Sequence, residues 1–510
     1  MQIAAPASHS LERMRRASWS LWGVTLVLVG LTGAVLRLWV YQSPLGIPDS
    51  DEAVVGLMAR YILHGSFTTF FWGQPYGGSQ EALLTAPAFL LFGSSWLVLR
   101  LIPIGLYALA TLVVWRVGRR TIGEPGAKAA AALLWLWPPF AILHTTHQYG
   151  FYASDIFYCA VLLLLSLRIV ERPDRIRVGV FGLVLGLAFW QTSQIVPIAA
   201  GVIPWTIWRQ RRCLRHLWVA LPLAALGALP WILYNLRHDW ASLDLVGGQG
   251  ATYARRLRLF VSPIMPELLG LRGTSLNHQA LLLPALLTYG VFVISAALFV
   301  YGAYKTRKTD ASLLYVVTLI YPFVYAISAR TFHVEEPRYA VALSPLLVLL
   351  VGQILWKWRW AAVAFGAATF ISVVYLHRIE VVVARNPSPP RDLTPLISTL
   401  DRLGLDRVYA EYYVAYRLDF ETRERIIAVE NRFDHVTFRD GKPVLADDPV
   451  VHWEPYEADV GNASRIGFVF FRSTAASRPI VLQLKRHGFR RYLTGPLVIY
   501  APPGPSPAGS

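Results

Sequence analysis

The chain has 510 residues, of which 55% are hydrophobic and 15% are charged, and its formal net charge is +17. This composition is too apolar for a soluble protein of this length, so the soluble globular classes are excluded. Short basic clusters between apolar segments carry much of the positive charge. They indicate membrane topology and give no reason to infer a nucleic-acid partner. Cys159 and Cys213 lie in a predicted helix and a predicted cytoplasmic loop, so we expect no disulfide.

Apolar segments recur through the first three quarters of the chain and predict about eleven transmembrane helices. We place them at residues 19–40, 95–117, 127–143, 155–170, 178–192, 195–208, 217–236, 280–304, 312–329, 339–356 and 361–376. Only a tight turn, containing Gln191, Gln194 and Pro197, separates the fifth segment from the sixth. If the number of spans changed by one at that turn, the total would be even and every later segment would have the opposite orientation.

Arginine and lysine clusters follow alternate segments, which places all of them on one side of the membrane under this scheme. The rule predicts a cytoplasmic tail at residues 1–18 and a multi-pass protein of the cytoplasmic (inner) membrane. The first segment is too long for a signal peptide and lacks a cleavage site, so we interpret it as an anchor. The C-terminal region is then extracytoplasmic.

The first outer loop, residues 42–94, is the most informative part of the chain. It opens with Asp49, Asp51 and Glu52 ahead of a short amphipathic helix, and Asp49 is the predicted N-cap of that helix. At 3.6 residues per turn, Asp51 lies on the apolar stripe and Glu52 lies at its edge. A buried carboxylate is costly unless it is paired or used, so this acidic group is either an ordinary helix cap or an active site.

More polar residues fall at the same predicted outer ends of the apolar segments. Snorkelling explains a single arginine, but a one-sided layer of acids favours the active-site interpretation. Two histidines beside Asp155 lack a third nitrogen or sulfur ligand, so we expect a polar cavity lining there and no zinc site. Arginines in the fourth outer loop would bind anionic lipid headgroups or a phosphate ligand. The residues in one layer with Asp51 are Arg37, Arg100, Asp155, Glu335, Glu336 and Arg338. The further candidates on the outer side are Glu81, His147, Arg255, Arg256, Arg272 and Tyr339.

The order of these motifs resembles the GT-C superfamily of integral-membrane glycosyltransferases. It is similar to the branch of protein O-mannosyltransferases and lipid A aminoarabinose transferases. The resemblance covers residues 19–376 and rests on the acidic first loop, residues 92–100, Asp155 and the run from Glu336 to Tyr339. Two features depart from the family: the proline pair after the first loop is absent, and so is the Trp-Trp-Asp motif of oligosaccharyltransferases.

An outer active site needs a lipid-carried donor, because nucleotide sugars are made in the cytosol. We therefore expect transfer from a polyprenyl-phosphate sugar to a glycan, lipid or protein hydroxyl, with surrounding membrane lipids as further partners. Asp51 is the predicted base, with Glu52 or Asp155 as the alternatives. Arg338, assisted by Tyr339 and the loop arginines, is predicted to bind the donor phosphate.

The resemblance also implies inversion at the anomeric carbon. It leaves open a divalent cation, Mg²⁺ or Mn²⁺, held by Asp51 and Asp155. Asp49, Glu81, His147 and Glu336 are expected to line the substrate cavity. A lipid-saccharide transporter or flippase, and a scaffold without activity, are the competing functions. A transporter would favour an internal inverted repeat, which we do not find.

The composition changes after residue 376. We predict a linker at residues 378–391, one extracytoplasmic α/β domain at 392–500 and a disordered tail at 501–510. No catalytic group of residues is evident in this domain, so acceptor recognition or lid formation is the expected role. The predicted fold class is a polytopic α-helical membrane protein of about eleven spans with a C-terminal α/β domain.

Overall fold

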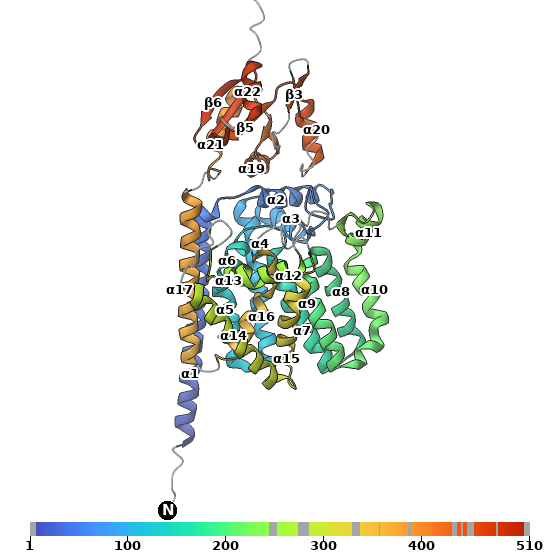
Figure 1. The fold of residues 1–510 in the computed structure, drawn as a ribbon, viewed down its shortest axis with the longest axis vertical. Helices are drawn as coiled ribbons and strands as arrows, with labels where there is room; N and C mark the ends of the chain where they lie inside the picture. The colour runs from blue at the N-terminus through green and yellow to red at the C-terminus, as the bar shows by residue number, and fades with distance from the viewer. Residues whose placement is uncertain are drawn as a thin grey trace, which may run out of the picture.

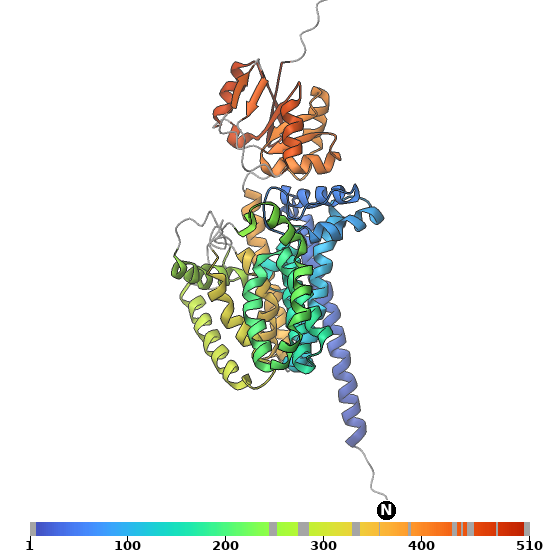
Figure 2. The ribbon, with the colours of Figure 1, turned by 90° about the vertical axis from the view of Figure 1, so that its right-hand side faces the viewer.

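The structure is a computed structural model. It describes residues 7–243, 252–273, 285–328, 337–355, 358–385, 389–430, 436–439, 442–445, 453–475 and 478–503. Three layers are stacked along its long axis (Figures 1 and 2): a bundle of long helices, two short helices lying across one end of the bundle, and an α/β domain above them. Glu336 lies outside the described residues.

Each predicted apolar segment coincides with a helix or with two consecutive helices. Four of these helices are long and apolar enough to cross a membrane alone, and two bent pairs raise the number to six within the described ranges. The larger total of about eleven stays a prediction. The helices are α1 (Ala7–Gln42), α4 (Trp96–Thr121), α5 (Gly123–Leu136), α6 (Pro139–Thr146), α7 (Tyr152–Glu171), α8 (Arg175–Gln191), α9 (Val196–Arg209), α10 (Leu217–Gly227), α11 (Leu229–Arg237), α14 (Ala285–Thr306), α15 (Ser312–Tyr325), α16 (Ser344–Gly352) and α17 (Trp358–Arg385).

Local chemistry explains where these helices break. Pro138 and Pro139 cannot donate backbone hydrogen bonds, and α5 and α6 meet there at 58°. Between α8 and α9, the Thr192 hydroxyl accepts a hydrogen bond from the Gln194 amide at 3.1 Å, so the predicted tight turn is present. Helix α17 continues to Arg385, through most of the segment predicted as a linker, because the apolar residues Val381, Val382, Val383 and Ala384 extend the helix beyond the predicted apolar stretch.

Helices α2 (Ser50–Leu63) and α3 (Gln80–Phe92) form the layer across the end of the bundle. Asp49 caps α2 as predicted, because its carboxylate accepts a hydrogen bond from the Glu52 amide at 3.1 Å. The helix ends before Gly65, whose φ of 84° is readily adopted only without a Cβ. Helix α3 is apolar, and it is shorter than the helices that could cross a membrane alone.

The C-terminal domain contains a five-stranded sheet in the order β2-β1-β5-β7-β6. Strand β1 is parallel to both of its neighbours, and β7 is antiparallel to both of its own. The strands are β1 (Arg407–Ala410), β2 (Ile427–Glu430), β5 (Gly467–Phe471), β6 (Arg490–Thr494) and β7 (Leu497–Ala501), with a separate hairpin of β3 (Val436–Arg439) and β4 (Lys442–Leu445). The helices are α18 (Thr394–Leu403), α19 (Tyr412–Thr422), α20 (Glu454–Asn462), α21 (Arg472–Ala475) and α22 (Pro479–Arg486).

Helix α2 shares one hydrophobic core with the C-terminal domain. Gly56 allows the Phe420 ring of α19 to approach closely, because an added Cβ would lie 2.5 Å from that ring. Trp72 of the first loop stacks on Trp453 with ring centroids 4.2 Å apart. Arg60 donates to the Phe420 carbonyl at 2.9 Å. The domain therefore packs directly on the first outer loop, which holds it over the acidic end of α2.

Candidate active site

Glu52 is the centre of a buried ionic network. Its carboxylate receives two hydrogen bonds of 2.6 Å from Arg100 of α4 and one of 3.1 Å from the Gln148 amide. His147 Nδ1 lies 2.8 Å from Glu52 Oε1. Arg100 also donates to the Gly46 carbonyl at 3.0 Å. The network ties α2, α4 and the loop before α7 together.

Burial alone would oppose ionisation of Glu52, whose side chain is 0% exposed. The charges of Arg100 and His147 and their hydrogen bonds outweigh that effect, so the pKa of the Glu52 carboxyl is lowered below its ordinary value. Glu52 is thus an ionised and fully paired group. A carboxylate held in this way is a poor proton acceptor.

Asp51 lies beside this network but has a different environment. The helical projection placed Asp51 on the buried stripe and Glu52 at its edge, and the structure reverses that order of burial. The reason is that α2 is covered on one side by the bundle and on the other by the C-terminal domain, so its buried residues do not form a single stripe. Asp51 stays partly exposed, and its carboxylate accepts a short hydrogen bond from the hydroxyl of Tyr412 in α19.

Tyr412 is the site residue that the sequence analysis missed. Burial, followed by the nearby charge of Asp51, raises the pKa of its hydroxyl well above the ordinary value. It therefore remains protonated and can donate at neutral pH. The Ser50 hydroxyl donates to the Tyr412 backbone carbonyl, so the domain contacts α2 twice at this point. No sequence pattern connects residues so far apart in the chain, and only docking of the domain brings them together.

Asp49 completes the acidic group at the start of α2. Burial, together with the charges of Asp51 and Glu52, raises the pKa of the Asp49 carboxyl well above its ordinary value. Tyr149, in the loop that also carries His147, responds electrostatically to all three acids. The three carboxylates and this tyrosine therefore form one cluster.

A second acidic pair lies where α3 meets α7. The Glu81 carboxylate accepts hydrogen bonds from the Ser154 hydroxyl at 2.6 Å and the Ser154 amide at 3.1 Å. Burial raises the pKa of Glu81 despite these bonds. Asp155 is fully buried, its carboxylate interacts electrostatically with Glu81, and neither of its oxygens has a hydrogen-bond partner among the described residues. An unpartnered buried carboxylate has a high desolvation cost, which is typical of functional sites.

The structure places the predicted phosphate-binding arginines in two locations. Arg338 lies at the start of the 3-10 helix η7 (Pro337–Leu343), where it hydrogen-bonds Tyr152 and lies near His144. The carbonyl of Tyr339 accepts a hydrogen bond from Tyr321 at 3.2 Å. Tyr152 is the first residue of α7, which begins just after the loop that binds Glu52, so Arg338 lies at the same end of the bundle as the acidic cluster.

Arg255 and Arg256 lie on α12 (Tyr253–Leu259), and Arg272 follows α13 (Met265–Leu268). Arg256 Nε donates to the Ala326 carbonyl at 2.6 Å, a bond that holds α12 against the end of α15. Arg256 therefore has a structural role as well as the predicted one.

The sequence matches no protein-family model and no curated protein. Solved structures are similar in fold. ArnT from Cupriavidus metallidurans in the apo state aligns with a TM-score of 0.60 at 16% identity, covering 95% of this chain and 98% of that one. ArnT from the same organism, bound to undecaprenyl phosphate, aligns with a TM-score of 0.58 at 15% identity. That alignment covers 93% of this chain and 97% of the ArnT chain.

The oligosaccharyltransferase of Archaeoglobus fulgidus, in complex with Zn and sulfate, aligns with a TM-score of 0.52 at 12% identity. That alignment covers 88% of this chain and 68% of the archaeal one. The chain therefore shares its overall fold with these solved membrane proteins, which agrees with the fold that the order of its motifs predicted.

Proposed function

We propose that this chain is an inverting membrane glycosyltransferase. It moves a sugar from a polyprenyl-phosphate donor to an acceptor hydroxyl at the outer face of the cytoplasmic membrane. The single observation that carries the proposal is the layer of carboxylates, Asp51, Glu81 and Asp155, gathered at one end of a GT-C bundle. Undecaprenyl phosphate bound to the similar ArnT structure supports a lipid-linked donor.

Asp51 is the proposed general base. An acceptor hydroxyl must lose its proton as it attacks the anomeric carbon, and a positioned carboxylate can take that proton. Asp51 is partly exposed, so an acceptor can reach it, whereas Glu52 is occupied by Arg100 and His147. Asp155 is fully buried and does not face solvent. Tyr412 holds the Asp51 carboxylate in place from the C-terminal domain.

A divalent cation, Mg²⁺ or Mn²⁺, fits best at Asp155 and Glu81. Asp155 offers two hard oxygen donors without hydrogen-bond partners among the described residues, and Glu81 supplies a second carboxylate. No group of three His, Cys, Asp or Glu side chains within those residues could hold a metal, so other ligands would complete the coordination. When bound, the ion would supply positive charge toward a departing phosphate. The pairing of Asp51 with Asp155, which the sequence analysis gives for this ion, stays a prediction.

Arg338 is the proposed ligand of the donor phosphate. Its guanidinium can form two parallel hydrogen bonds to phosphate oxygens, and it lies beside Tyr152 and His144. Arg255 and Arg272 remain further candidates at this end of the bundle.

Donor turnover tests the proposed function. The purified protein would be incubated with synthetic polyprenyl-phosphate hexoses and pentoses, with and without Mg²⁺ or Mn²⁺. We expect release of free polyprenyl phosphate, detected by mass spectrometry, when membrane extracts supply the acceptor. A flippase would move the donor without cleaving it, so binding without any cleavage across this donor set would contradict the proposal.

The topology gives a second test. Alkaline phosphatase fused after Ser510 is expected to be active, because the alternating basic clusters place the C-terminal domain outside the cytoplasm. A reporter that fluoresces only in the cytoplasm, fused at the same position, should stay dark. The opposite pair of results would mean that one span is miscounted, most plainly at the turn between α8 and α9.

A further inference from the structure

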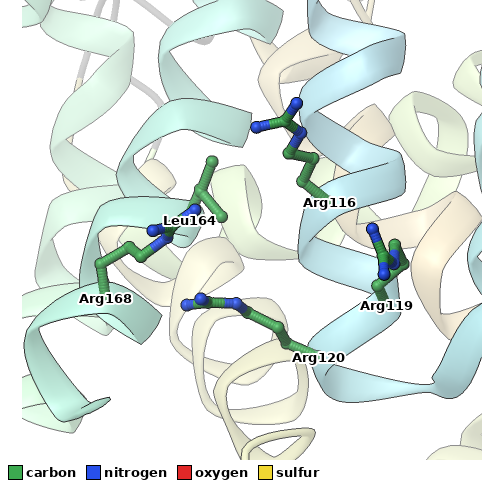
Figure 3. Close-up of a pocket in the computed structure, with 5 residues that line it drawn as sticks. All are labelled: Arg116, Arg119, Arg120, Leu164 and Arg168. Atoms are coloured by element: carbon green, nitrogen blue, oxygen red, sulfur yellow. The ribbon is translucent and has the colours of Figure 1, made fainter.

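A second site lies at the far ends of α4 and α7 from the acidic layer (Figure 3). Arg116, Arg119 and Arg120 of α4 and Leu164 and Arg168 of α7 line a pocket of about 450 Å³. We call this group the arginine pocket. Its size is within the roughly 300–1,000 Å³ of pockets that bind small molecules.

The two helices separate the arginine pocket from the candidate active site by nearly the thickness of a membrane. Arg100 and Asp155 lie near the starts of α4 and α7, whereas the pocket lies near their ends. At a rise of about 1.5 Å per residue, Arg116 is roughly 24 Å along the helix axis from Arg100. Both helices are long and apolar enough to span a bilayer, so the pocket faces the opposite leaflet.

The pocket has a surplus of positive charge. Arg119 pairs with Glu124 at 2.8 Å and Arg120 pairs with Glu171 at 3.0 Å, and both of these acids are exposed. Neither Arg116 nor Arg168 has an ion pair or a side-chain hydrogen bond with another described residue. Arg116 and Arg120 are four residues apart and share one face of α4, and Arg168 extends toward them from α7.

The positive-inside rule accounts for basic residues at this end of the bundle, but it requires only that they be near the membrane surface. It does not explain why four arginines from two helices line one pocket. Arginine forks suit the oxygens of a phosphate ester, and Leu164 adds an apolar wall beside them. This combination fits the boundary between the headgroup and the acyl chains of a lipid.

We propose that the arginine pocket binds the phosphate of an anionic phospholipid in the leaflet opposite the candidate active site. The inference rests on the geometry of α4 and α7 and does not depend on the glycosyltransferase assignment. Arg116 and Arg168 supply the charge that no acid within the described ranges neutralises.

The test compares two charge-preserving double variants of the full-length protein in detergent. R116K/R168K removes the two unpaired guanidinium forks, and R211K/R212K makes the same change at exposed arginines of η3 (Arg211–His216), outside the pocket. Binding of short-chain phosphatidylglycerol would be measured by calorimetry, beside phosphatidylcholine of equal chain length and inorganic phosphate. Because lysine keeps the charge, insertion and unliganded melting temperature should be unchanged in both.

We expect phosphatidylglycerol to bind the wild type and R211K/R212K equally, and to bind R116K/R168K about tenfold more weakly. Equal affinity for phosphatidylcholine would overturn the proposal, because it would make the contact apolar. Inorganic phosphate binding as tightly as the lipid would reassign the pocket to a soluble ligand. Equal affinities in the two double variants would show that the arginines act only through overall charge.

Discussion

Asp51→Asn is expected to reduce sugar transfer by about 100- to 10,000-fold, the usual contribution of a general base, and to leave the protein folded. Asparagine has nearly the shape of aspartate and can still accept the hydrogen bond from Tyr412, but it cannot take a proton from the acceptor hydroxyl. The measurement is release of polyprenyl phosphate from a synthetic donor, together with the melting temperature. Activity within a few-fold of the wild type would mean that Asp51 is not the base and is only an acidic residue at the start of α2.

Tyr412→Phe is the matched control for this prediction. It removes the hydrogen bond between the domain and Asp51 but keeps the carboxylate and the ring contact of residue 412 with Tyr416 in α19. We expect a smaller loss of activity than in Asp51→Asn. Equal losses in the two variants would mean that Asp51 matters by holding the C-terminal domain, and the base would then have to be sought at Asp155.

Glu52→Gln is expected to lower the free energy of unfolding by about 3–5 kcal/mol, because it leaves the Arg100 guanidinium buried without its counter-charge. Both partners are almost completely inaccessible to solvent, at 2% and 0% exposure. Chemical denaturation at neutral pH measures the loss. Because the pKa of Glu52 is lowered in the folded protein, its stabilising contribution is present above its ordinary value of 4.5 and is lost on acidification below that value.

Two variants separate the buried network from a general effect of lost charge. Glu124→Gln makes the same substitution in the ion pair between Glu124 and Arg119, whose side chains are 38% and 54% exposed. It should lower the free energy of unfolding by no more than about 1 kcal/mol. Combining Glu52→Gln with Arg100→Met should recover part of the lost stability, because the guanidinium is then no longer buried without its counter-charge. A wild-type denaturation midpoint in Glu52→Gln, with transfer abolished, would show that Glu52 acts in catalysis.

The contrast between two adjacent carboxylates shows what the C-terminal domain adds to the site. Asp51 and Glu52 follow each other in α2, yet one faces the domain and the other faces the bundle. Ser50 and Tyr412 hold the domain directly above Asp51. Any movement of the domain would therefore change the surroundings of the proposed base, while Glu52 would keep its partners in α4 and the following loop.

The sequence alone determined the membrane class, the apolar segments and the acidic end of the first outer loop. Long apolar runs must form helices in a bilayer because their backbone groups have no water to bind, so such segments can be identified without any tertiary contact. The N-cap at Asp49 and the break after Gln191 depend on neighbouring residues only, and for that reason both were predictable. The GT-C resemblance came from the order of these features along the chain.

Only the tertiary structure decided which carboxylate is paired. A helical projection treats α2 as having one buried face, but the bundle and the C-terminal domain bury it from two sides, so Glu52 is enclosed and Asp51 is left partly exposed. Arg100 is 48 residues from Glu52 and Tyr412 is 361 residues from Asp51, and no local pattern encodes either contact. Likewise, the sequence identified the basic residues at the ends of α4 and α7 as markers of membrane topology. That they line one pocket could not be predicted, because it depends on how the two helices pack.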